Sequence, residues 1–307
     1  MGHEIVILGV FVADTAYRAE RQPKMGETVL GNSFALGPGG KGSNQAVAAA
    51  RAGGDVAFVS RLGDDAFADM AMQTWADAGV TADVSRDPES YTGAAYIFVE
   101  EASGNNAIII APGAAARISV EDIDAKADLI RGAKVFVTQL EQPLDAANRA
   151  LEIAREAGAI TILNPAPAAE LSDEILALCD YVTPNESEAE ALTGMAVTSP
   201  EDAARAAEAL VARGVGRVII TLGENGALLY EDGEPFHVAA LRAGAVAETT
   251  GAGDAFNGGL AVALAEGRCA ADAVRFGTAT AAISVTRPGT APSMPERAEI
   301  DALLSCA

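Results

Sequence analysis

The sequence predicts an α/β fold, with a doubly wound, mainly parallel sheet, helices on both faces and a small β-sheet lid. Short apolar runs alternate with helix-like stretches along most of the chain, as in repeated βα units. Two patches, approximately residues 13–36 and 91–111, resemble short strands separated by turns, and we expect them to form the lid. With 307 residues, 50% of them hydrophobic, the chain can bury a large core, and we expect a single domain over residues 1–307.

The elements of the main sheet follow from local patterns. Residues 5–12 are a continuous apolar run, which is typical of a central strand buried on both faces. A helix is expected at 64–79 because the pattern ends at a glycine. The remaining expected strands lie at 55–61, 134–138, 159–163, 181–183 and 218–222. Further helices are expected at 120–130, at 144–158 and from about 184 onward.

Polar residues follow several of these strands at their carboxyl ends. In a parallel sheet those ends share one edge, so the side chains should converge on a single crevice. Each residue alone could be a helix cap, but the repeated position indicates a site. The residues are Asp14, Glu141, Asn164, Asn185, Glu188 and the turn 221–226.

Composition disfavours several classes of protein. Lys and Arg number 21 against 43 Asp and Glu, and the net charge of −22 argues against nucleic acid or an anionic membrane as a partner. Cys179, Cys269 and Cys306 form no CxxC pair, so neither a disulfide framework nor a structural zinc site is expected. Only His3 and His237 could serve a histidine-based site. We find no signal peptide or membrane-length apolar run and expect a cytoplasmic protein.

A glycine–lysine loop, Gly37-Pro-Gly-Gly-Lys-Gly-Ser-Asn-Gln45, precedes a helical run at 46–51. It matches the G-x-G-x-x-G pattern of dinucleotide-binding loops, and this match is the ground for an alternative, an NAD-dependent oxidoreductase. However, it does not follow the first strand, and the expected acid about 20 residues later is missing. Gly42 separates Lys41 from Ser43, so the loop is not a P-loop either. It brings Lys41 and Asn44 to a helix start, which suits a hydroxyl-rich or anionic ligand; the alternative is a purely structural turn.

A second loop, Glu248-Thr-Thr-Gly-Ala-Gly-Asp-Ala-Phe-Asn-Gly-Gly259, opens another helix. The small residues Gly251, Ala252 and Gly253 let main-chain N–H groups approach a ligand. A helix N-terminus carries a partial positive charge, so phosphate or a developing oxyanion could bind there. Asp254 lies at its centre, either as a helix cap or as a base that takes a proton.

In order and spacing, these segments resemble the ribokinase-type (PfkB) family of carbohydrate kinases over essentially the whole chain. The matching segments are Gly39-Gly-Lys-Gly-Ser-Asn-Gln45, Asn164-Pro-Ala-Pro167, Thr183-Pro-Asn-Glu-Ser-Glu188, Thr221-Leu-Gly-Glu-Asn-Gly226 and Gly251-Ala-Gly-Asp254. The resemblance implies transfer of the γ-phosphate of ATP to the hydroxymethyl group of a small sugar, with ribose as the leading candidate. Asp254 would be the general base, and Gly251, Ala252 and Gly253 would form an anion hole.

The resemblance also implies the ligand contacts and an assembly. Sugar-binding positions would be Asp14, Gly40, Lys41, Asn44, Glu141 and Asp254. Nucleotide-binding positions would be Asn185, Thr221, Gly223, Gly226, Gly253 and Thr278. Mg²⁺ bound with ATP would be held by Asn185 and Glu188, partly through water. K⁺, as an activator, would be held by Glu248, Thr250, Ser284, Arg287, Gly289 and Ser293. The family likeness further implies a homodimer through the lid.

Three departures from the family pattern keep alternatives open. Val12 replaces the usual sugar-contacting asparagine, which would leave a sugar hydroxyl unpaired at a cost of about 1–3 kcal/mol. Another sugar, a keto-deoxy sugar acid or a nucleoside is therefore an alternative substrate, and a non-catalytic sugar sensor is an alternative function. Glu248 replaces an aspartate of the cation site, and Thr278 replaces a longer polar residue near the expected adenine site.

Overall fold

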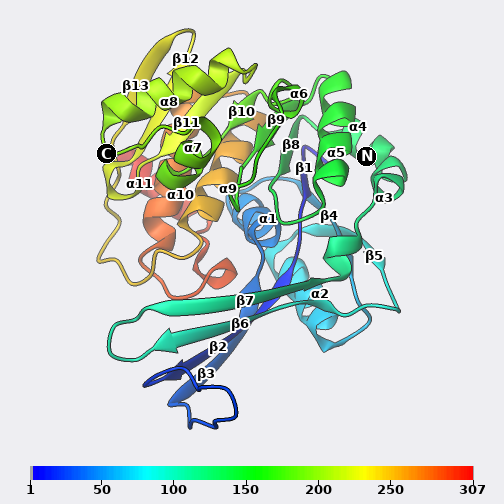
Figure 1. Ribbon diagram of the computed structural model, residues 1–307. Helices are drawn as coiled ribbons and strands as arrows, with labels where there is room; N and C mark the ends of the chain where they lie inside the picture. Colours follow the sequence, from blue (N-terminus) through cyan, green and yellow to red (C-terminus); the bar gives the residue numbers. More distant parts are fainter. Residues whose placement is uncertain (1–2, 307) are drawn as a thin grey trace.

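The computed structural model describes residues 3–306, and its strands form two sheets (Figure 1). Adjacent strands of the larger sheet are parallel except at one edge, where the last strand but one is antiparallel to both of its neighbours. The nine strands lie in the order β13 (Glu234–Val238), β12 (Ala227–Glu231), β11 (Arg217–Thr221), β10 (Tyr181–Val182), β9 (Ile160–Leu163), β8 (Val135–Thr138), β1 (Ile5–Leu8), β4 (Val56–Leu62) and β5 (Thr81–Arg86).

The second sheet, called the small sheet below, projects from the main body at the bottom of Figure 1. Its four strands lie in the order β3 (Ser33–Gly39), β2 (Val12–Ala19), β6 (Thr92–Glu100) and β7 (Asn106–Gly113). The predicted fold class, a mainly parallel sheet with an accompanying smaller sheet, is confirmed. Both strand-rich patches of the sequence lie in the small sheet.

Helices cover both faces of the larger sheet, as predicted. One face carries α1 (Lys41–Arg51), α2 (Ala66–Ala78), α9 (Ala252–Ala265), α10 (Ala270–Ser284) and α11 (Arg297–Ser305). The other carries α3 (Val120–Asp124), α4 (Ala127–Arg131), α5 (Leu144–Glu156), α6 (Asp173–Leu176), α7 (Glu186–Thr193) and α8 (Pro200–Ala212). Short 3₁₀ turns lie at Ala114–Arg117, Gly223–Asn225 and Ala291–Ser293.

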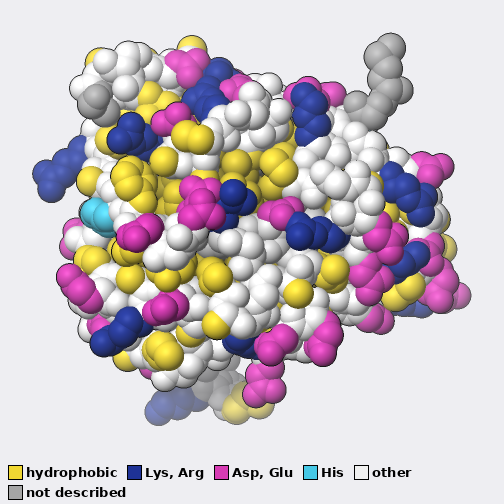
Figure 2. All heavy atoms as spheres, turned by 90° about the horizontal axis from the view of Figure 1, so that it is seen from above, with side chains coloured by type: hydrophobic (Ala, Val, Ile, Leu, Met, Phe, Trp, Pro, Cys, Tyr) yellow, Lys and Arg dark blue, Asp and Glu magenta, His cyan; other side chains and the backbone are white. Residues whose placement is uncertain are grey.

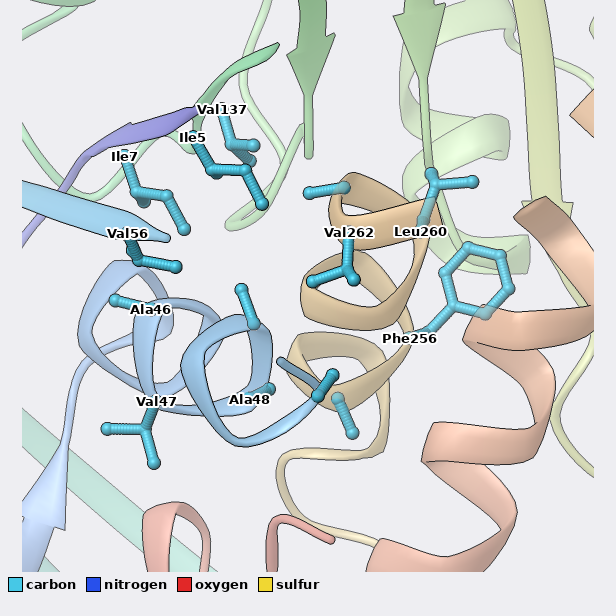
Figure 3. Close-up of a cluster of buried hydrophobic side chains, with 14 of the residues drawn as sticks. Ile5, Ile7, Ala46, Val47, Ala48, Val56, Val137, Phe256, Leu260 and Val262 are labelled. Atoms are coloured by element: carbon cyan, nitrogen blue, oxygen red, sulfur yellow. The ribbon is translucent and has the colours of Figure 1, made fainter. Parts of the chain in front are cut away.

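The strands separate two apolar cores because successive side chains of a strand point to opposite faces. Ile5 and Ile7 of β1 pack in the core that contains α1 and α9, whereas Val6 and Leu8 pack in the core that contains α5 and α8. Figure 3 shows Ile5, Ile7 and Val137 above α1 and α9. The continuous apolar runs of the sequence thus reflect burial on both sides.

Glycines bring α9 close to its neighbours α1 and α10. A Cβ atom on Gly258 would lie 2.5 Å from the Ala48 Cβ, and one on Gly259 would lie 2.4 Å from the Thr280 Oγ1. Every residue from Asp254 to Ala265 is buried. Helix α9 is therefore held at the centre of the molecule.

The structure corrects three predicted boundaries. The run 5–12 is not one strand, because β1 ends at Leu8 and Val12 already begins β2 of the small sheet. The helix expected at 46–51 begins at Lys41. The helix expected at 120–130 is two short helices, separated where the Lys126 N–H donates to the Ile123 carbonyl in a tighter turn. The antiparallel pair β12 and β13 was not predicted.

A cavity of about 640 Å³ lies at the amino ends of β9, β10 and β11. Ion pairs between Arg155 and Asp180 and between Arg217 and Glu231 line it. Figure 2 looks down on this side of the molecule, where apolar side chains gather between charged ones. The cavity thus lies at the amino ends of these strands, whereas the polar cluster is predicted at the carboxyl ends. In residues 3–306 we find no helix that combines the length and apolar character needed to cross a membrane.

Candidate active site

The start of helix α9 brings main-chain amides beside a buried carboxylate, and the Ala252 N–H donates to the Thr249 carbonyl over 3.2 Å. Gly251 takes a φ of 81°, a left-handed conformation that glycine adopts without strain, and it ends the loop that leads into the helix. A Cβ atom on Gly253 would meet nothing within 4 Å. Gly253 is therefore not required for internal packing, and open space lies in front of it. That space fits a ligand that approaches the helix N-terminus.

Asp254 lies in the first turn of α9 and is 7% exposed. Its carboxylate does not cap its own helix. The Asn44 Nδ2 donates to Asp254 Oδ2 over 2.9 Å, and the Gln45 Nε2 donates to Asp254 Oδ1 over 3.2 Å. Both donors belong to α1. The geometry therefore disagrees with the cap interpretation, and the role of Asp254 as a base stays a prediction.

The glycine–lysine loop packs tightly against the small sheet. A Cβ atom on Gly39 would lie 2.2 Å from the Asp14 Oδ2, so any side chain there would displace that carboxylate. Gly40 has a φ of 89° and passes close to the Val10 carbonyl. The Lys41 N–H then donates to Glu141 Oε2 over 2.7 Å, which satisfies the first amide of α1. Residues distant in sequence thus form one wall of the site.

Burial sets the electrostatics of this cluster. It raises the pKa of Asp14 to about 6. It raises the pKa of Glu141 to about 7, against the opposing effects of the Lys41 N–H and the Lys41 charge. Burial also raises the pKa of Asp254, while the Lys41 charge and the hydrogen bonds from Asn44 and Gln45 lower it. A single lysine thus faces several desolvated carboxylates, and it stabilises their ionised forms.

Among the side-chain atoms that are buried without a partner in the described chain, two belong to predicted ligand-binding positions. Asn44 Oδ1 accepts no hydrogen bond, although the Asn44 amide nitrogen is bound to Asp254. Thr278 Oγ1, in α10, is likewise unpaired. An unpaired buried polar group costs about 1–3 kcal/mol, so these atoms mark positions where a bound ligand would complete the hydrogen bonding.

Asn185 and Glu188 form a capping box at the start of α7. Asn185 Oδ1 accepts from the Glu188 N–H over 2.8 Å, and Glu188 Oε2 accepts from the Asn185 N–H over 2.9 Å. Asn185 also bridges Thr221 at the end of β11. Burial raises the pKa of Glu188. The Lys41 charge lowers this pKa, and the Asp254 charge raises it. The pair therefore has a structural role, and Glu188 lies within reach of the charges of Lys41 and Asp254.

The turn after β11 depends on two glycines. Gly223 and Gly226 have φ angles of 53° and 91°, and a Cβ atom on Gly226 would lie 2.0 Å from the Val238 carbonyl. This close approach joins the turn to β13. The main-chain atoms of 221–226 are thereby fixed at the carboxyl edge of the sheet.

The positions predicted to hold K⁺ lie on two adjoining segments. The Ala247 and Glu248 N–H groups both donate to the Val285 carbonyl, and Glu248 Oε2 accepts from the Gly289 N–H over 2.8 Å. The remaining predicted side chains are bound locally: Ser284 to the Ala281 carbonyl, Ser293 to the Thr290 carbonyl and Arg287 to Glu299. For Thr250 the structure shows an exposed position directly before Gly251.

Sequence reasoning missed several polar residues behind the site. Gln45, Gln139 and Asn257 are buried and hydrogen bonded around Asp254, and Thr290 donates to the Pro38 carbonyl over 2.8 Å. The one available signal was a polar residue inside an apolar helix, as at Asn257 between Phe256 and Gly258. The pairing of these residues was not visible, because their partners are distant in the sequence.

A buried carboxylate in the first turn of a helix, at the carboxyl ends of parallel strands, suits an enzyme that handles an anionic group. The chain belongs to the pfkB family of carbohydrate kinases, whose family model matches residues 3–297. The resemblance predicted from the sequence motifs is therefore confirmed. The protein is an ATP-dependent sugar kinase of the ribokinase-like type.

Relatives and a solved structure are similar to this chain over nearly its whole length. Ribokinase of Haemophilus influenzae is 39% identical over 97% of this chain and 97% of its own length. Deoxyribokinase of Salmonella typhimurium is 38% identical over 98% and 99% of the two chains. The structure of Arabidopsis thaliana ribokinase complexed with ribose and ATP superposes with a TM-score of 0.93, at 33% identity, and 99% of each chain is covered.

Proposed function

We propose that this kinase transfers the γ-phosphate of ATP to the hydroxymethyl group of a pentose, with Asp254 as the general base. The observation that carries the proposal is the position of Asp254, buried in the first turn of α9 next to Gly253, where an added Cβ atom would meet nothing within 4 Å. A base must lie within hydrogen-bond reach of the proton that it takes, and the phosphate must reach the amides at the same time. One short loop offers both groups.

The chemical step needs only positions and charges from the protein. The sugar oxygen forms a bond to the γ-phosphorus as the bond from that phosphorus to the β-phosphate oxygen breaks. The hydroxyl proton passes to the Asp254 carboxylate, whose pKa is raised by burial and lowered by the Lys41 charge and the hydrogen bonds from Asn44 and Gln45. The N–H groups of Gly251, Ala252 and Gly253 would donate to the charge that develops on the transferred phosphate.

The sugar would be held by Asp14, Gly40, Lys41, Asn44 and Glu141. The unpaired Asn44 Oδ1 supports this assignment, because a sugar hydroxyl could donate to it. Val12 lies on β2, two residues before Asp14, and is 5% exposed. It offers no hydrogen bond to a hydroxyl there.

Ribose is the leading substrate, and a deoxypentose is the second candidate. Val12 favours the second, because a sugar without the facing hydroxyl loses nothing against an apolar side chain. A relative of this chain is named deoxyribokinase. Other sugars, keto-deoxy sugar acids and nucleosides remain further alternatives to include in a substrate panel.

ATP would bind along Asn185, Thr221, Gly223, Gly226, Gly253 and Thr278, and the unpaired Thr278 Oγ1 supports a ligand there. In residues 3–306 no cluster of three or more His, Cys, Asp or Glu side chains could hold a metal ion. The residues fit Mg²⁺ that is bound mainly by phosphate and water, with Glu188 and Asn185 contributing, as magnesium prefers. When bound, Mg²⁺ neutralises charge on the phosphates.

K⁺ is proposed as an activator beside the anion loop. Glu248 supplies a carboxylate whose second oxygen is not used by Gly289, and Thr250, Ser284, Arg287, Gly289 and Ser293 would contribute mainly main-chain carbonyls. Because Glu248 is longer than the aspartate of the family pattern, the test is a comparison of turnover in K⁺, Na⁺ and Li⁺ salts. Equal turnover in all three would remove the proposal.

The chain is proposed to act as a single domain in which the small sheet is a lid over the sugar. The outer strands β3 and β7 expose large apolar side chains, which supports a homodimer through this sheet. Nucleic acid and membranes are not proposed as partners, since the net charge is −22. A cytoplasmic location stays a prediction.

ADP release over a panel of sugars, with and without Mg²⁺, tests the proposed function. We expect turnover on ribose or on a deoxypentose, and Asp254→Asn should abolish it while sugar binding, measured by calorimetry, stays nearly intact. Tight binding of a sugar without turnover on any panel member would favour the sensor. Turnover by Asp254→Asn close to that of the unaltered protein would refute the base.

A further inference from the structure

A chain of buried polar side chains lies behind Asp254 and connects elements from both halves of the sequence. We call it the amide chain: Gln45 of α1, Gln139 after β8, Asn164 after β9, Thr183 after β10 and Asn257 of α9. Each of these side chains is at most 7% exposed. Buried polar groups need partners, and a network of them is worth its desolvation only when every member is well placed.

Gln45 is the branching point of the amide chain. Its Nε2 donates to Asp254 Oδ1 over 3.2 Å and to Asn164 Oδ1 over 3.1 Å, so both of its N–H bonds are used. Its Oε1 accepts from the Gln139 Nε2 over 2.6 Å. The Gln45 amide is therefore held from three sides.

The rest of the amide chain leads back to the anion loop. Asn164 Nδ2 donates to the Thr183 carbonyl over 3.1 Å, and the Thr183 hydroxyl donates to Asn257 Oδ1 over 2.7 Å. Asn257 Nδ2 then donates to the Gly253 carbonyl over 2.9 Å. That carbonyl belongs to the peptide between Gly253 and Asp254, so the chain starts at the carboxylate and ends at the main chain that bears it.

The direction of every hydrogen bond in the amide chain is fixed. The Thr183 and Gly253 carbonyls can only accept, so the amide nitrogens of Asn164 and Asn257 must face them. This leaves Asn164 Oδ1 as an acceptor, and the Gln45 nitrogen must face it and the carboxylate. A rotated amide is therefore not compatible with this pattern, although the Gln139 Oε1 accepts no hydrogen bond.

We propose that Gln45 is a positioning residue, which holds the Asp254 carboxylate in line with the sugar hydroxyl and couples its orientation to the Gly253–Asp254 peptide of the anion loop. The proposal rests on the proposed function, in which Asp254 is the base. A misplacement of about 1 Å in a reacting group can cost about 100-fold in rate. Removing the Gln45 amide should therefore act on turnover and not on sugar binding, because Gln45 lies behind the carboxylate.

Gln45→Met keeps the length of the side chain and removes its hydrogen bonds. We expect kcat to fall about 10- to 100-fold with a nearly unchanged KM for the sugar. Removing a donor from a carboxylate disfavours its ionised form, so the acid limb of the kcat–pH profile should move to higher pH. Other charged groups face Asp254, namely Lys41 of α1, Asp14 of β2, Glu141 after β8 and Glu188 of α7. None of them has a hydrogen bond to the Gln45 side chain, so a shift caused by this substitution reports on Asp254.

Gln142→Met is the matched control. Gln142 is also buried, and its amide donates to the Thr138 hydroxyl and the Gln139 carbonyl, without contact to Asp254. Both variants should lose melting temperature, whereas only Gln45→Met should lose kcat and move the acid limb. Equal kinetic effects in the two variants, or an unmoved acid limb in Gln45→Met, would overturn the proposal.

Two further variants separate the remaining outcomes. If Gln45→Met does not fold, Gln45→Glu is used, because it keeps the shape of the side chain and puts a second carboxyl group beside Asp254. The acid limb of the kcat–pH profile must then move to higher pH. An unmoved acid limb would again overturn the proposal. Asp254→Asn is measured in parallel. Retained turnover in that variant removes the proposed function itself, whereas lost turnover with an unmoved limb in Gln45→Met removes only the positioning role.

Discussion

Individual carboxylates of the candidate site are removed from water by the fold, which disfavours their ionised forms. Glu141 is the clearest case, because its carboxylate accepts the Lys41 N–H and yet burial raises its pKa to about 7. When such a group is ionised, its burial lowers the stability of the folded protein. The pH dependence of folding should reveal that cost.

Glu141→Gln should make the stability of the protein less dependent on pH. From the ordinary pKa of 4.5 up to about 7, the folded state keeps the Glu141 proton while the unfolded state releases it. The unfolded state then binds fewer protons, so stability falls as pH rises through this window. The Gln variant keeps the acceptor for Lys41 and should be more stable than the unaltered protein by about 1–3 kcal/mol near pH 8. Urea unfolding at about pH 5 and pH 8 measures it, and equal gains at both values would contradict the expectation.

Val12→Asn should shift substrate preference towards ribose. The amide would pair with a hydroxyl that valine leaves unsatisfied, a difference of about 1–3 kcal/mol, or roughly 5- to 150-fold in kcat/KM. The ratio of kcat/KM for ribose over 2-deoxyribose is the measurement. Val12→Ala, which adds room but no hydrogen bond, is the control, and an equal shift in that variant would show that space and not pairing decides.

At the scale of elements, local patterns predicted most strands and helices but not where α1 begins. The residues Lys41 to Gln45 are mixed glycine and polar, so the sequence placed the helix start at Ala46. In the structure Glu141, 100 residues away, satisfies the Lys41 amide, and Gln45 is bound to Asp254 and Asn164. Such long-range partners cannot be found from local periodicity. The capping box of Asn185 and Glu188 was local and visible, yet its structural role was masked by the functional interpretation.

A pair of glycines in α9 should separate catalysis from folding. A Cβ atom on Gly258 would lie 2.5 Å from the Ala48 Cβ and 2.8 Å from the Ala49 nitrogen, so Gly258→Ala should destabilise the protein by about 1–3 kcal/mol. A Cβ atom on Gly253 meets open space, so Gly253→Ala should keep its melting temperature and lose turnover, as the methyl group occupies the proposed anion position. Thermal unfolding and ADP release on both variants test this. A melting temperature that falls in Gly253→Ala but not in Gly258→Ala would contradict this expectation.

At the scale of the whole molecule, the two sheets differ in how they are covered. The larger sheet has helices on both faces, whereas β7 exposes Ile108, Ile109 and Ile110 in succession. Since successive residues of a strand point to opposite faces, both faces of this edge strand are apolar and uncovered. The fold class was predictable because the alternation of strands and helices is a property of the whole chain. The role of this edge strand was not predictable, because an exposed apolar surface does not by itself identify what binds to it.

Ile109→Lys should weaken the proposed homodimer. Ile109 is 68% exposed, so the substitution leaves the core intact, and a charge at the centre of an apolar contact opposes association. Light scattering after gel filtration should show a lower mass at equal concentration. Met195→Lys is the matched control, because Met195 is also an exposed apolar residue but follows α7, in the main body. A mass that responds equally to both substitutions would argue against the small sheet as the interface.

The burial of α9 has a consequence for how activity is lost. Because every residue from Asp254 to Ala265 is buried between α1, α10 and the larger sheet, the amides of α9 can exchange with solvent only when the surrounding core opens. Hydrogen exchange of this helix should therefore be as slow as global unfolding permits, while the small sheet exchanges sooner. The anion loop is thus attached to the last part of the protein to open, and heat should remove activity and fold together.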